Sequence, residues 1–166
     1  MDTLIAFPVI LVAIILQTTI VSRLTLINGT ADLVLLVVVA WSLQDRARNA
    51  WVWAVFAGAL ISYISALPFL APLISYLVIV VIARMFHNRV WQSPILGMFV
   101  ITFVATLVQN LVSYLALLFG GMSISFNEAA GIVTMPSLIL NLLLALPVYL
   151  MINDLAHWVY PEENEI

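Results

Sequence analysis

Few residues in this chain have the chemistry that catalysis needs. The two histidines, His87 and His157, lie near the ends of apolar segments beside arginine or tryptophan, and there is no cysteine. Side-chain catalysis requires a base near a nucleophile, or a bound metal. Neither a nucleophile motif, a metal-binding motif nor a phosphate-binding glycine loop occurs in the sequence. The sequence therefore predicts a protein that is not an enzyme and that uses no metal or cofactor.

Three neutral amide side chains interrupt long apolar runs. Gln109 and Asn110 lie in the run 95–119, and Asn141 lies in the first half of the run 135–155. Polar groups are costly inside a membrane and generally face other protein groups there. The three amides can share one layer slightly outside the membrane midplane. They can form interhelical hydrogen bonds or contribute to a substrate site, and the lack of a charge beside them favours the structural interpretation.

Arg23 and Asp32 flank a short connection between the first two apolar runs. Thr30 in this connection is a candidate helix cap, which would place Asp32 in the first turn, at the positive end of the helix dipole. Arg23 is the positive charge that we expect outside the cytoplasm, so we expect it to have a specific use. Two interpretations remain open: a local ion pair between Arg23 and Asp32, and a contact between Arg23 and a partner protein.

The composition of the chain indicates which solvent surrounds these residues. Of 166 residues, 65% are hydrophobic and 8% are charged, and the mean hydropathy is +1.21. Soluble domains carry about 25% charged residues, so the chain is predicted to lie in lipid. Only helices and closed barrels satisfy every backbone group there, and the continuous apolar runs lack the alternation of barrel strands. The predicted fold is an all-α, polytopic membrane helix bundle in one domain.

Polar clusters divide the chain into six apolar segments. These predicted spans are about 4–21, 31–43, 51–67, 69–83, 95–119 and 135–155. The second is short against the roughly 20 residues that cross a full hydrocarbon core. Tryptophans near the segment ends, among them Trp41, Trp51, Trp53 and Trp158, are typical of interfacial belts.

The arginines predict the orientation. Arg46 and Arg48 share one connection, Arg84 and Arg89 share another, and an even number of spans separates the two. The positive-inside rule makes both connections cytoplasmic, so six spans put both termini in the cytoplasm. If segment 31–43 is instead re-entrant, the chain has five spans and its N-terminus lies outside the cytoplasm. All five arginines then lie on the cytoplasmic side, so the arginine distribution alone slightly favours five spans. That segment has no glycine or proline to break it, which favours six spans.

Several local patterns follow one another along the chain in a fixed order. They are Leu16-Gln17-Thr18-Thr19, a helix start at Asp32-Leu33-Val34-Leu35-Leu36, a basic turn, Gly58-Ala59-Leu60, a proline-bearing hairpin, and Tyr76-Leu77 in a helix ending at Arg84. In this order they resemble the rod shape-determining protein MreD family over nearly the full length. Ser62 and Tyr63 stand where that family commonly has an acidic residue, so this chain does without the acid's role or performs it differently.

The resemblance implies a non-enzymatic scaffold of the bacterial cell-elongation machinery in the cytoplasmic membrane. It implies an MreC-type bitopic membrane protein as partner, and links to a RodA-type glycosyltransferase, a class B penicillin-binding protein and the MreB filament. Such a protein helps to control cell shape and peptidoglycan synthesis. From their own chemistry and positions, we expect Arg23, Asp32, Gln109, Asn110 and Asn141 to serve partner binding or interhelical polar contacts, and not catalysis.

The family's six-helix fold is similar to the substrate-binding subunits of energy-coupling-factor transporters, which supplies an alternative function. The alternative is a subunit that captures a vitamin or another small molecule. Such subunits present a pair of small residues on the first helix for docking, whereas Ala6 and Ala13 are seven residues apart here with bulky residues between them. The sequence therefore favours the scaffold.

Overall fold

The computed structural model describes residues 2–23, 29–45, 47, 49–90, 93–122 and 125–160. Within these ranges the chain is helical and contains no strand, which confirms the all-α prediction. The six long helices are α1 (Asp2–Thr19), α2 (Leu33–Ser42), α3 (Ala50–Ile64), α4 (Leu70–Val90), α5 (Pro94–Phe119) and α7 (Met135–Val159). Three short elements connect them: η1 (Val21–Arg23), α6 (Phe126–Glu128) and the π-helix η2 (Ala129–Thr134).

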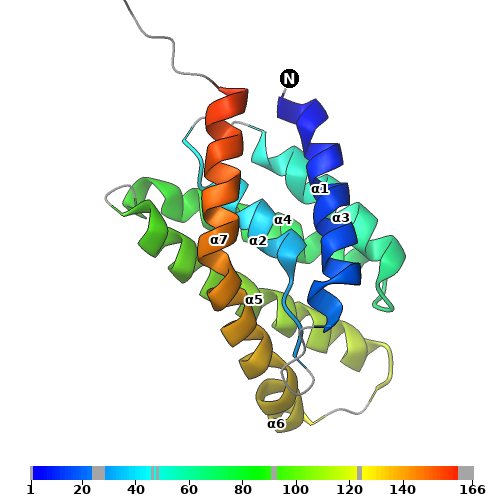
Figure 1. Cartoon of the computed structure of the whole chain (residues 1–166). Coiled ribbons are helices and arrows are strands. Elements are labelled where there is room, and N and C mark those ends of the chain that lie inside the picture. The colour runs from blue at the N-terminus through cyan, green and yellow to red at the C-terminus, as the bar shows by residue number, and fades with distance from the viewer. Residues whose placement is uncertain are drawn as a thin grey trace, which may run out of the picture.

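The shortest of the long helices, α2, lies at the centre of the bundle. It packs against α1, α3, α4, α5 and α7, and Figure 1 shows it between α1 and α7. Every residue from Val34 to Ser42 is buried. A helix that is apolar all round is stable only where protein or lipid surrounds it completely, and here neighbouring helices do so. The core of the molecule is therefore built around α2.

Helices α3 and α4 form a closely packed hairpin. A methyl group on Gly58 would lie 2.8 Å from the Cα atom of Leu73, so glycine is what allows the two backbones to approach. The hydroxyl oxygen of Ser62 lies 2.7 Å from the carbonyl oxygen of Gly58 and 2.6 Å from that of Phe69. Ser62 thus ties the end of α3 to the start of α4.

The tryptophans do not all form an interfacial belt. Trp41 of α2 and Trp53 of α3 are fully buried and stack with ring centroids 4.1 Å apart. These two side chains face neighbouring helices, so the prediction of a lipid-facing belt is wrong for them. Trp51 and Trp158 are exposed. A tryptophan near a segment end lies near one end of its helix. Whether its side chain faces other helices or the outside depends on the packing of α2 inside the bundle, which the sequence pattern does not show.

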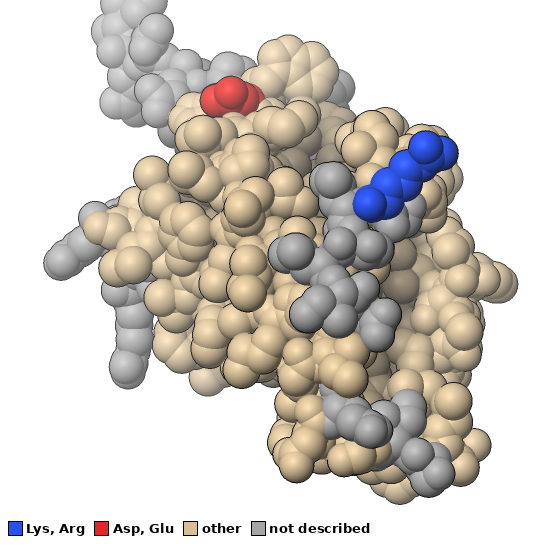
Figure 2. Space-filling model, turned by 60° about the horizontal axis from the view of Figure 1, so that its bottom comes forward, with Lys and Arg blue, Asp and Glu red and all other residues tan. Residues whose placement is uncertain are grey.

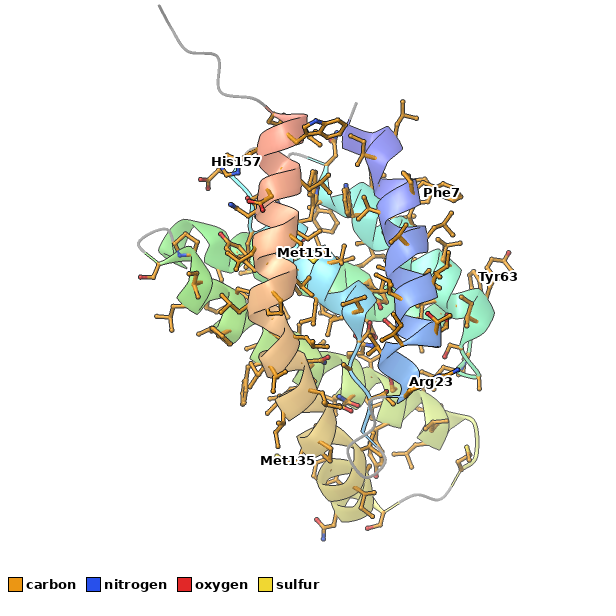
Figure 3. The ribbon with its side chains drawn as sticks, in the orientation of Figure 1. Phe7, Arg23, Tyr63, Met135, Met151 and His157 are labelled. Carbon is orange, nitrogen blue, oxygen red and sulfur yellow. The ribbon has the colours of Figure 1, made fainter. Side chains whose placement is uncertain are left out.

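Among the described residues, two helices are long and apolar enough to cross a membrane, Pro94–Phe119 and the continuous stretch Ala129–Val159, and the other long helices contain shorter apolar stretches. The start of α1 and the end of α7 lie at the same end of the molecule (Figure 1). Large apolar side chains are exposed on every long helix except α2, and Figure 3 shows Phe7, Tyr63 and Met151 on the outside. Such extensive exposed apolar surface is not typical of a monomer in water.

Candidate functional site

The candidate site is centred on Asp32, which is the N-cap residue of α2. The Oδ1 atom of Asp32 accepts a hydrogen bond of 2.8 Å from the backbone N–H of Leu35. The first N–H groups of a helix have no partner inside the helix, and a capping carboxylate satisfies one of them. The prediction that Thr30 caps this helix is wrong, because Asp32 itself occupies that position.

The Asp32 carboxylate also joins α2 to two other helices. The hydroxyl group of Tyr76 on α4 lies 3.3 Å from both carboxylate oxygens, and the Nε2 atom of Gln109 on α5 donates a short hydrogen bond to Oδ2. Asp32 is partly buried and Tyr76 is almost fully buried. The three donors offset part of the cost of burying this carboxylate.

Arg23 does not take part in this arrangement. It is exposed at the end of η1, and the partners of Asp32 are Leu35, Tyr76 and Gln109 (Figure 3 labels Arg23). The predicted local ion pair between Arg23 and Asp32 is therefore wrong. The carboxylate is turned into the bundle, where it caps a buried helix, and Arg23 stays at the surface.

The extended segment before α2 is bonded to α7. The backbone N–H of Asp32 donates to the Oδ1 atom of Asn141 at 2.7 Å, and the N–H of Thr30 donates to the hydroxyl oxygen of Ser137 at 3.2 Å. Ser137 and Asn141 are one turn apart, so they lie on the same face of α7. A methyl group on Gly29 would be only 2.6 Å from α7, which means that the two backbones nearly touch.

Two further bonds complete the cluster. The Oε1 atom of Gln17 on α1 accepts a hydrogen bond of 3.0 Å from the N–H of Val34, and the Nδ2 atom of Asn141 donates to the hydroxyl oxygen of Thr106 at 3.0 Å. We call the side chains that meet here the Asp32 network. Its members are Gln17, Asp32, Tyr76, Thr106, Gln109, Ser137 and Asn141.

The structure brings Asp32, Gln109 and Asn141 together but places Asn110 apart from them. The Nδ2 atom of Asn110 donates to the carbonyl oxygen of Thr106 in its own helix, and its side chain faces an apolar groove. Gln17, Tyr76, Thr106 and Ser137 were missed by the sequence analysis. Each is a polar residue in or beside an apolar run, and this was the available signal.

The Asp32 network has the composition of a structural joint. Its carboxylate and amide groups bond to one another, to the hydroxyls of Tyr76 and Thr106, and to the backbone at the start of α2. Gln109 Oε1 is buried without a hydrogen-bond partner among the described residues. No histidine or cysteine belongs to the network. Among the described residues no three metal-ligating acidic, histidine or cysteine side chains gather anywhere. The arrangement can therefore fix five helices at one point, α1, α2, α4, α5 and α7.

No protein-family model matches this chain, and comparisons with curated proteins and with solved structures give no significant match.

Proposed function

We propose that this chain is a non-enzymatic membrane scaffold of the bacterial cell-elongation machinery, with an MreC-type bitopic protein as its partner. The proposal places it in the cytoplasmic membrane, crossing six times with both termini in the cytoplasm. Through that partner it would act with a RodA-type glycosyltransferase, a class B penicillin-binding protein and the MreB filament. Two lines support it: the resemblance of the sequence to the MreD family, and the way the polar groups of the core are used.

The use of the core polar groups is the observation that carries the proposal. A transporter subunit needs convergent polar groups that are free to bind a substrate. Here Asp32, Gln109 and Asn141 bond to one another's helices and to the start of α2. Among the described residues, none of these three lines the apolar groove beside α5. Apart from Gln109 Oε1, the polar contacts of these three residues hold helices together, which supports a scaffold that binds through its outer surfaces.

The geometry of residues 29–42 favours six spans over five. The extended residues 29–32 rise about 3.3 Å each and the ten residues of α2 rise about 1.5 Å each, giving about 13 Å and about 15 Å. Together they approach the roughly 30 Å of a hydrocarbon core. Non-helical backbone is tolerated at this depth where protein surrounds it, and Ser137 and Asn141 supply the acceptors.

The arrangement of the ends favours the cytoplasmic placement of both termini. In Figure 1 the α2–α3 connection lies at the same end as the start of α1 and the end of α7. That connection carries Arg46 and Arg48, which are two of the five cationic residues of the chain. Both lie outside the described residues. The positive-inside rule then assigns this end to the cytoplasm.

Co-purification tests the proposal. The full chain is co-expressed with an affinity-tagged MreC-type protein and with a tagged, unrelated single-span protein as control, and both are extracted in mild detergent. We expect the chain to co-elute with the MreC-type protein and not with the control. Equal recovery with both baits, or no recovery with either, would contradict the proposal. Saturable binding of a riboflavin- or thiamine-like ligand would favour the transporter instead.

A further inference from the structure

We draw no further inference here: the strongest candidate, the open apolar groove between α5 and η2 at the end of the molecule that Figure 2 turns forward, has an uncharged lining among the described residues, as any lipid-facing surface does, and nothing in the structure shows what covers it.

Discussion

Replacing Gly29 by alanine perturbs the point where the extended segment meets α7. The added methyl group would lie 2.6 Å from both Pro136 Cβ and Ser137 N, about 0.9 Å inside an ordinary contact of about 3.5 Å. If the segment retreats by that distance, the 3.2 Å bond from Thr30 N–H to Ser137 lengthens to about 4 Å and is lost. Overpacking costs about 1–3 kcal/mol and an interhelical bond in a membrane about 0.6 kcal/mol.

Part of this loss is offset, because alanine reduces the freedom of the unfolded chain by about 0.4–1 kcal/mol relative to glycine. We therefore expect Gly29→Ala to lower the free energy of unfolding by about 1–3 kcal/mol, measured by reversible unfolding in mixed detergent micelles. Gly131→Ala is the control, since its methyl group meets no atom within 4 Å, and it should stabilise by about 0.5–1 kcal/mol. If Gly29→Ala matched the control, the close approach to α7 would be wrong.

Three further predictions concern the Asp32 network and the topology. Asn141→Leu removes the bonds to Asp32 N–H and Thr106 and should lower the free energy of unfolding by about 0.5–2 kcal/mol in the same assay, without loss of partner binding. Asp32→Leu leaves three donors without their acceptor and should lower the free energy of unfolding by more, about 2–4 kcal/mol. A smaller decrease than for Asn141→Leu would show that the carboxylate does not hold the bundle together. Cysteines placed singly at Thr30 and Asp45 should react with an impermeant maleimide from opposite sides of the membrane; reaction of both from the cytoplasmic side would exclude six spans and favour five.

The helices could be predicted from the sequence because its apolar runs are long, continuous and free of alternation. Runs of this length, such as those containing Gln109 and Asn141, are typical of helices and not of strands, and the structure confirms both helices. Their ends agree with α5 and α7 to within a few residues. Sequence periodicity was less useful for α2, because a helix buried on all sides has no polar face to show its orientation.

The candidate site could be predicted only in part. Polarity within long apolar runs singled out Gln109 and Asn141, but not their common partner, because Asp32 is 77 residues away from Gln109 and 109 residues away from Asn141 in the sequence. Nearness in sequence instead suggested Arg23 for Asp32. Which residues contact Asp32 depends on how the helices pack side by side, and no local sequence pattern predicts that packing. The role of Gly29 also depends on the position of α7.

The thermal stability of the purified chain with candidate ligands tests the scaffold proposal most directly. A ligand that binds only the folded state, at 100 times its Kd, stabilises by about 2.7 kcal/mol, which raises Tm by several degrees. We predict that the transmembrane segment of an MreC-type partner, reconstituted with the chain in nanodiscs, raises Tm, while riboflavin- and thiamine-like compounds leave it unchanged. A rise in Tm with such a compound, and none with the partner segment, would contradict the scaffold account.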